Sequence, residues 1–394
     1  MPTYSPEFEK KKESVNALIK SLKNKEDYNI LQAVYSDTNI VDEFYIKEKL
    51  DKVNLTYFTG MNQSELLNHF TKDIFNNKGE RYYEELFQEI YNRQSKNNGY
   101  EPRYLIDCSG EVGKANGFIR HGSNVLNINS GIIEKYKLID QYSNDISTKN
   151  ANTIGAHTLL TLIHETQHTF QCEGLMNFVL GLDKNNPHDR ARNAISLARM
   201  SLINYLHSPT TDLRDPDVRE LADLIRQNYA YDYMEHDSNM APIRFLKNEL
   251  INGTLPSDVF LQAGMQRVIR DIHIDKASWE GEIPTLLDER ATKMESIING
   301  YHKFFEKYMV DGPIKKDVCS VLKDYLKTDE LGMSKFRTDL NSDFNMCLNF
   351  IEYTKTNTVS NYENNTNEYD KPKTLVKILR KTRNFNDEEN SNIA

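Results

Sequence analysis

The chain has 394 residues and a formal net charge of −9, with 38% hydrophobic and 27% charged residues. This composition is that of a folded globular protein, and the negative charge argues against nucleic acid or an anionic membrane as a general partner. The length accommodates two to three domains, or one large unit with a helical appendage.

The N-terminus has no apolar run after its lysines, and no stretch of the chain approaches the length of a bilayer span. We therefore expect no transmembrane segment. The four cysteines are isolated, which fits a reducing cytoplasm. Export by a route that needs no signal peptide is a further hypothesis, with which the acidic residues Asp387, Glu388 and Glu389 near the end of the polar tail are compatible.

The first part of the chain, residues 1–99, is predicted to be an N-terminal helical region. Apolar residues recur at helical spacing in residues 64–75 and 82–91. Three short β-rich segments follow, at residues 104–108, 116–119 and 124–129, separated by Gly, Ser and Asn turn residues. These segments predict a small sheet.

A long helix is predicted to begin at residue 152 or 153 and to pass residue 170, with Gly174 as its stop signal. Further helices are predicted over residues 189–207, 217–229 and 242–250. The polar stretch 354–369 is predicted to be a flexible linker. A short basic amphipathic segment follows the linker and leads into the polar tail.

The long helix contains the pattern HExxH at His164, Glu165 and His168. Residues four apart on a helix differ by about 40° in direction, so both imidazoles can reach one tetrahedral zinc ion while Glu165 lies beside them. Apart from Glu165 itself, no charged residue lies next to the two histidines. The apolar residues of this helix lie on the opposite face, which predicts a buried back and a cleft in front of the histidines.

A third metal ligand is expected from a later helix. Glu235 is followed four residues on by Asn239, whose amide could bond a ligand imidazole on the same helix face. Glu289 is the rival third ligand. We favour Glu235, because it alone has such a partner at the fourth position after it. His157 and Glu173 are weaker candidates on the HExxH helix.

These residues resemble the zincin metallopeptidases and, among them, the gluzincins, which combine HExxH with a Glu on a later helix. The resemblance covers about residues 104–245. It implies that His164, His168 and Glu235 bind one zinc ion per chain and that Glu165 is the general base. Asn239 stands where many gluzincins have Asp, and Pro242 lies where the Glu-bearing helix should continue.

The metzincin pattern is excluded, because Gln171 and Gly174 stand where that family has Gly and its third His. Zincins also use a hydrogen-bond donor to the oxyanion. The candidates near Glu235 are Tyr229, Tyr231, Tyr233 and His236, of which we prefer Tyr231, one helical turn before Glu235.

The expected fold is therefore α+β and mostly helical. It comprises a zincin-like catalytic domain at 100–300, with a small mixed sheet before the HExxH helix, a helical region at 301–353, and a linker and tail at 354–394. The expected function is zinc-dependent hydrolysis of a protein or peptide, with residues 124–129 as the edge strand that pairs with the substrate. The alternative is a catalytically inactive protein or a purely helical binding protein. That the chain is a secreted bacterial effector is a further hypothesis.

Overall fold

The computed structural model of the chain describes residues 57–70, 80–108, 117–119, 125–128, 148–179, 181–207, 211, 214–272, 283–309, 311–327 and 332–363. Helices dominate these residues, and three short strands form one small mixed sheet before the longest helix. This confirms the expected mostly helical α+β class. The tail beyond residue 363 and the first 56 residues, on which some of the expectations fall, lie outside the described residues.

The N-terminal part contains helix α4 (Gln63–Asn68) and helix α5 (Glu80–Asn97). Asn62 caps α4, because its side chain accepts from the Glu65 N–H and Glu65 bonds back to the Asn62 N–H. The prediction for residues 82–91 falls within α5. The predicted helix at 64–75 ends at Asn68, and residues 71–79 are not among the described ones.

The sheet consists of β1 (Leu105–Asp107), β2 (Gly117–Ile119) and β3 (Val125–Ile128), in the order β1-β3-β2. Strand β3 is parallel to β1 and antiparallel to β2. The expectation that residues 124–129 form an edge strand is therefore wrong, because β3 has a neighbour on both sides. Within the described sheet the edges are β1 and β2, and β2 also contacts the HExxH helix.

The HExxH helix, α7 (Thr148–Val179), continues through Gly174, so the predicted stop at this glycine is wrong. Gly174 faces the Asn193 side chain of a neighbouring helix, where a Cβ would collide. The glycine therefore permits close packing. The chain turns at Gly181 instead, which has a φ of +66°, and the Leu182 N–H donates to the Asn177 carbonyl at 2.8 Å.

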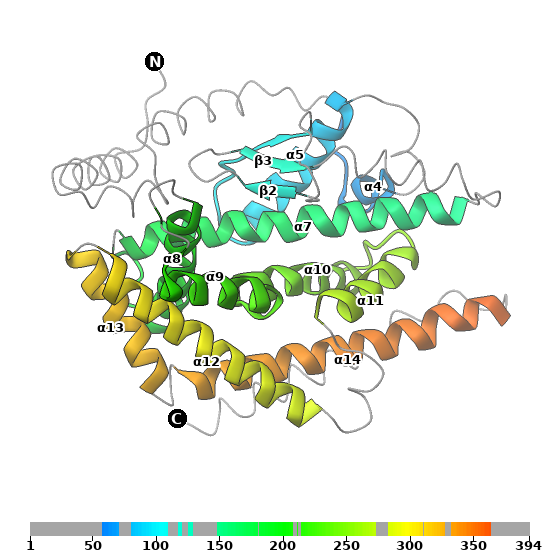
Figure 1. Cartoon of the computed structure of the whole chain (residues 1–394). Coiled ribbons are helices and arrows are strands. Elements are labelled where there is room, and N and C mark those ends of the chain that lie inside the picture. Colours follow the sequence, from blue (N-terminus) through cyan, green and yellow to red (C-terminus); the bar gives the residue numbers. More distant parts are fainter. Residues whose placement is uncertain are drawn as a thin grey trace, which may run out of the picture.

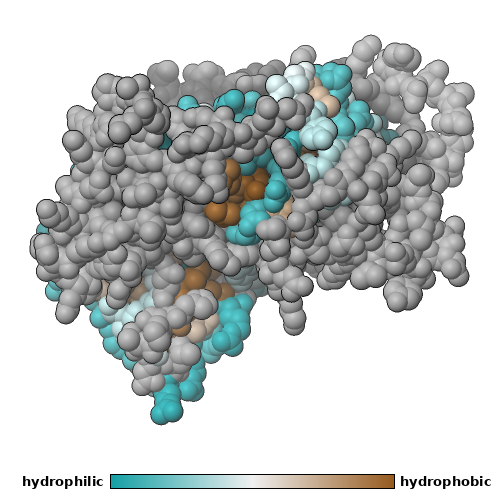
Figure 2. Space-filling view, turned by 90° about the horizontal axis from the view of Figure 1, so that it is seen from above, coloured by the Kyte–Doolittle hydropathy of each residue, from teal (hydrophilic) through white to brown (hydrophobic). Residues whose placement is uncertain are grey.

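The second half consists of α8 (Pro187–His207), α9 (Pro216–Asn228), a 3₁₀ turn η2 (Tyr229–Tyr231), α10 (Tyr233–Ile251), α11 (Val259–Asp271), α12 (Ile283–Tyr308), α13 (Pro313–Lys327) and α14 (Met333–Glu363). Helix α7 crosses the molecule, with α5 and the sheet on one side and α10 and α11 on the other (Figure 1). Helix α14 lies beyond α10 and α11. Seen from the side of the sheet, hydrophobic residues gather near the centre of the face, bordered by hydrophilic ones (Figure 2).

The buried hydrophobic residues form one continuous cluster from Phe58 to Tyr353. Helix α12 runs across the expected boundary between residues 300 and 301. The expected linker is also wrong for its first ten residues, 354–363, because α14 extends to Glu363. Thr354 is fully buried and donates to the Phe350 carbonyl at 2.8 Å, so this polar side chain is satisfied within the helix.

No described helix has both the length and the apolar character needed to span a membrane.

Candidate metal centre

The two histidines of α7 lie side by side on one helix face. Their ring centroids are 5.0 Å apart and the rings are nearly perpendicular. One ligand atom each from His164, Glu165 and His168 lies within 4.8 Å of the others. Helical spacing brings these three side chains together. Two buried leucines on the other side of the helix, Leu159 and Leu162, fix its orientation about its axis.

Glu235 lies opposite the histidines, in the first turn of α10. Its carboxylate oxygens are 3.8 Å from His164 Nε2 and 3.8 Å from His168 Nε2. Asp232 begins this helix by accepting from the Met234 N–H at 3.0 Å. Glu235 is thus held at a fixed point of a capped helix and is almost completely buried.

The rival Glu289 lies elsewhere. It is exposed on α12 and forms an ion pair with Lys293 at 2.7 Å. His157 bonds Gln266 at 2.9 Å, and Glu173 pairs with Arg103 at 2.6 Å. Of the candidate third ligands, the structure brings only Glu235 to the histidine pair.

Arg199 of α8 holds the Glu235 carboxylate in place. Its Nη2 donates to Glu235 Oε1 at 2.8 Å, and its Nε lies 3.0 Å from Asp232. Tyr301 donates to the same aspartate at 2.5 Å. Burial lowers the pKa of Arg199, but Asp232 and Glu235 raise it above its usual value, so the guanidinium is charged. The sequence analysis missed Arg199. A lone charge in the mostly apolar stretch 194–203 was the available signal.

His168 is oriented through its other ring nitrogen. His168 Nδ1 lies 2.8 Å from Gln171 Oε1 and 3.1 Å from Ser238 Oγ. Gln171 is in turn 3.1 Å from Asp237. Gln171 and Asp237 were not among the predicted site residues, although Gln171 is one helical turn after His168.

Burial lowers the pKa of His164 well below its usual value, and His168 and Arg267 act in the same direction. The Ser238 backbone and the Asn239 side chain oppose this shift, which places the predicted partner Asn239 beside the His164 imidazole. Neither the Ser238 backbone nor the Asn239 side chain satisfies the distance and angle limits of a hydrogen bond to His164 Nδ1. This nitrogen is buried and has no hydrogen-bond partner among the described residues. His164 is therefore neutral near pH 7, as a metal ligand must be.

Pro242 lies inside α10, so the predicted helix at 242–250 is the second half of a longer helix. A proline has no N–H, and the carbonyl four residues earlier, that of Ser238, therefore lacks its helical donor. This is the backbone group that acts on His164. Pro242, which departs from the family pattern, thus leaves the Ser238 carbonyl oxygen without a helical donor near the candidate ligand His164.

Glu165 is buried behind the histidines, and burial raises its pKa to about 7, with Glu235 acting in the same direction. Gly117 of β2 packs directly on it. A Cβ at position 117 would lie 2.6 Å from Glu165 Cγ. Glycine is therefore required where the sheet meets the carboxyl group.

Tyr229, rather than the preferred Tyr231, lies near Glu235 and Arg199. Burial, the charge of Glu235 and a side-chain hydrogen bond to Glu235 raise the pKa of Tyr229, while 53% of the residue stays exposed. Tyr231 lies against α12, with Lys293 Nζ 4.1 Å from its ring centre. His236 bonds Asp343 at 2.9 Å. Tyr231, one turn before Glu235, lies in the 3₁₀ turn η2, and its role as donor to the oxyanion stays a prediction.

The side chains fit a zinc ion. Two nitrogens and a carboxylate are a usual zinc donor set, and neighbouring ligands around a tetrahedral zinc lie about 3.3 Å apart. At 3.8 Å the two Nε2 atoms are too far from Glu235 for hydrogen bonds but are near the separation of ligands that share one ion. The described group could therefore bind a metal.

Comparison of the chain with protein-family models, with curated proteins and with solved structures found no match in any of the three. Function has to be inferred from the geometry and chemistry of the site.

Proposed function

We propose that the chain is a zinc-dependent, gluzincin-like peptidase in which His164, His168 and Glu235 hold one metal ion. The observation that carries this proposal is the convergence of both Nε2 atoms on one buried carboxylate, each at 3.8 Å. The hydrolytic role follows from Glu165, a carboxyl group beside the same ion site that is not needed as a third ligand.

Zinc in this position supplies Lewis-acid polarisation of a carbonyl group and makes water more acidic. Glu165 performs the proton transfers. Its pKa of about 7 lets it accept a proton from the attacking water and pass it to the leaving amine near neutral pH. Burial keeps this carboxyl group away from bulk water.

Two further residues assist in the proposed site. Arg199 donates a hydrogen bond to Glu235 and keeps its carboxylate oriented, so the ligand does not turn away from the histidines. The half-exposed Tyr229 presents its hydroxyl next to Glu235 and is the proposed donor to the oxyanion that forms on the substrate. The proposed substrate is an extended peptide, because β2 is an edge strand next to Glu165 and peptides pair with such edges.

The test is metal content, measured on purified wild type, His168→Ala, Glu235→Gln and Glu289→Gln after zinc loading. About one zinc per chain is expected in wild type and in Glu289→Gln, with loss in the other two variants. Glu289→Gln is the matched control because it removes a carboxylate from an exposed helix. An absence of zinc from loaded wild type would refute the proposal.

Activity is measured on the same preparations with a library of unstructured peptides, read by mass spectrometry. Glu165→Gln should keep its zinc and lose peptide cleavage by at least about 100-fold. Tyr229→Phe should keep zinc and lose at least about tenfold, while Tyr231→Phe should behave as wild type. Cleavage by Glu165→Gln at the wild-type rate would exclude this residue as the base.

A further inference from the structure

Gln171 connects a candidate metal ligand to the partly buried carboxylate of Asp237. Its Oε1 lies 2.8 Å from His168 Nδ1. Its Nε2 has three oxygen neighbours: Met234 O at 2.9 Å, Asp237 Oδ2 at 3.1 Å and Ser238 Oγ at 3.2 Å. The amide therefore joins helix α7 to the first turns of α10.

These neighbours determine which way the amide points. A carbonyl oxygen and a carboxylate oxygen only accept hydrogen bonds, so the group facing Met234 and Asp237 must be the NH₂. The reverse orientation would place Gln171 Oε1 against two acceptors, one of them charged. The carbonyl end of Gln171 consequently faces His168.

The orientation of Gln171 in turn determines the tautomer of His168. An acceptor 2.8 Å from Nδ1 requires a proton on that nitrogen. In a neutral imidazole Nε2 then carries the lone pair, and this is the atom that faces Glu235. The opposite tautomer would place a proton on Nε2 and block metal binding.

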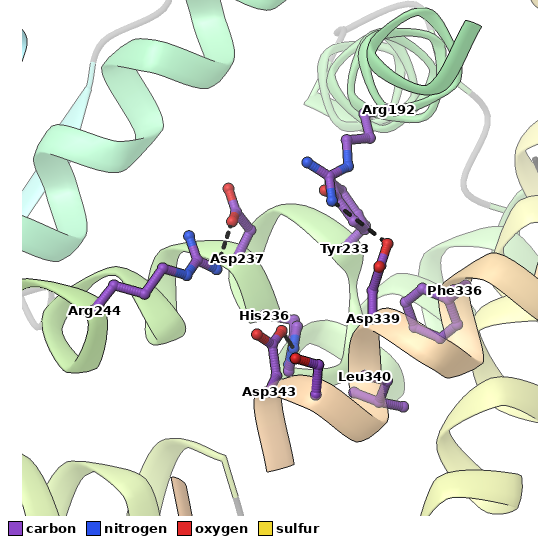
Figure 3. Close-up of a pocket in the computed structure, with 10 residues that line it drawn as sticks. Arg192, Tyr233, His236, Asp237, Arg244, Phe336, Asp339, Leu340 and Asp343 are labelled. Carbon is purple, nitrogen blue, oxygen red and sulfur yellow. Dashed lines mark hydrogen bonds and ion pairs between the residues drawn. The ribbon is translucent and has the colours of Figure 1, made fainter. Parts of the chain in front are cut away.

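Asp237 is fixed by three donors. Gln167 and Gln171 donate to Oδ2, at 2.7 Å and 3.1 Å, and Arg244 Nη2 donates to Oδ1 at 2.8 Å. Figure 3 shows the Arg244–Asp237 pair on one side of a pocket of about 220 Å³ between α8, α10 and α14. A second ion pair in the same pocket joins His236 and Asp343 at 2.9 Å.

We propose that Asp237 is a positioning residue that acts through Gln171 to hold His168 in its Nδ1–H tautomer, with Nε2 free to bind metal. Its significance for zinc binding rests on the proposed function, but the tautomer itself does not. Asparagine at position 237 would offer one acceptor to three donors. If the oxygen of this asparagine still accepts from Arg244, its NH₂ group would face Gln171. The Gln171 amide would then turn and place its own NH₂ group against His168.

The tautomer is read by ¹⁵N NMR of the full chain labelled at histidine, freed of metal by chelator at pH 8.5, where histidines of ordinary pKa are neutral. The His168 signals are identified by their loss in His168→Ala. Wild type should show the Nδ1–H tautomer, and Asp237→Asn should shift His168 toward Nε2–H. Zinc affinity, measured against a chelating dye, should fall about 10- to 100-fold in Asp237→Asn.

Two further variants separate this role from a structural one. Asp237→Asn combined with Gln171→Glu exchanges the carboxylate and the amide, places an acceptor directly on His168, and should restore both the tautomer and the affinity. Asp343→Asn removes the His236–Asp343 ion pair of the same pocket and should change neither.

A wild-type His168 in the Nε2–H tautomer would overturn the proposal without any variant. So would Asp237→Asn with an unchanged tautomer. These measurements of the tautomer need no metal, so they test the proposal even when the wild-type chain fails to bind zinc. A failure to bind zinc would refute only the proposed function.

Discussion

Burial acts in opposite directions on two adjacent residues of α7. It lowers the pKa of His164 well below the usual value and raises the pKa of Glu165 to about 7. Both shifts favour the uncharged form, because an interior position disfavours any charge. The permanent positive charge of Arg199 lies in the same metal-free site, 2.8 Å from Glu235 Oε1.

The raised pKa of Glu165 makes a prediction about stability. The folded chain binds this proton more tightly than the unfolded chain, so the free energy of unfolding falls as pH rises from 4.5, the usual pKa of a glutamate, to about 7. Glu165→Gln removes this effect. It should stabilise the metal-free chain at pH 8 by about 3 kcal/mol and have little effect near pH 4.5.

Urea unfolding of chelator-treated wild type and Glu165→Gln at the two pH values checks this. Equal stabilities at pH 8 would show that Glu165 ionises without penalty in the folded chain.

Helix α10 positions Glu235, the proposed third ligand, and contacts both histidines. Its first turn presents Glu235, its next residues reach the two imidazoles through Ser238 and Asn239, and Pro242 interrupts its hydrogen bonding. The interruption falls at the Ser238 carbonyl, next to His164. Helix α10 therefore lacks one backbone hydrogen bond, and the carbonyl group left without a helical donor is a polar group at the site.

The variant Pro242→Ala tests whether the missing backbone hydrogen bond lowers stability and favours zinc binding. Alanine restores the N–H that bonds the Ser238 carbonyl within the helix, which should raise the free energy of unfolding of the metal-free chain by about 1–3 kcal/mol. The same bond competes with His164, so zinc affinity should fall. Thermal unfolding and dye competition measure the two effects.

Pro216→Ala is the control, because Pro216 stands in the first turn of α9, where no helical N–H is missing. It should change neither quantity. A Pro242→Ala chain that binds zinc as tightly as wild type would show that the Ser238 carbonyl plays no part in orienting His164.

At the scale of the whole molecule, the C-terminal helices support the site. Tyr301 of α12 bonds Asp232, Asp232 pairs with Arg199 of α8, and Arg199 bonds Glu235. The catalytic region expected to end at residue 300 is thus joined to a helix that crosses this position, and one hydrophobic cluster spans both sides.

Tyr301→Phe should therefore destabilise the chain by about 1–3 kcal/mol, because it removes a donor from a buried carboxylate. Tyr308→Phe is the control on the same helix. It loses a bond of 3.2 Å to the partly exposed Asp215 and should have a smaller effect. Urea unfolding compares the two, and an effect of Tyr301→Phe no larger than that of Tyr308→Phe would contradict the expected role.

The sequence by itself placed His164, Glu165 and His168 on one helix face, because residues one turn apart on a helix must lie together. It also predicted the mostly helical class and the short strands, which depend on local periodicity. Glu235 was preferred over Glu289 from its local pattern, although only the packed chain showed which carboxylate reaches the histidines.

Tertiary structure decided the rest. Contacts between segments far apart in the chain determine the order of the strands, the position of Tyr229 near Glu235, the continuation of α14 past residue 353, and the partners Arg199 and Asp237. Such contacts depend on the orientation of each helix about its axis and on how the helices pack against one another. The spacing of residues within one segment does not determine that orientation.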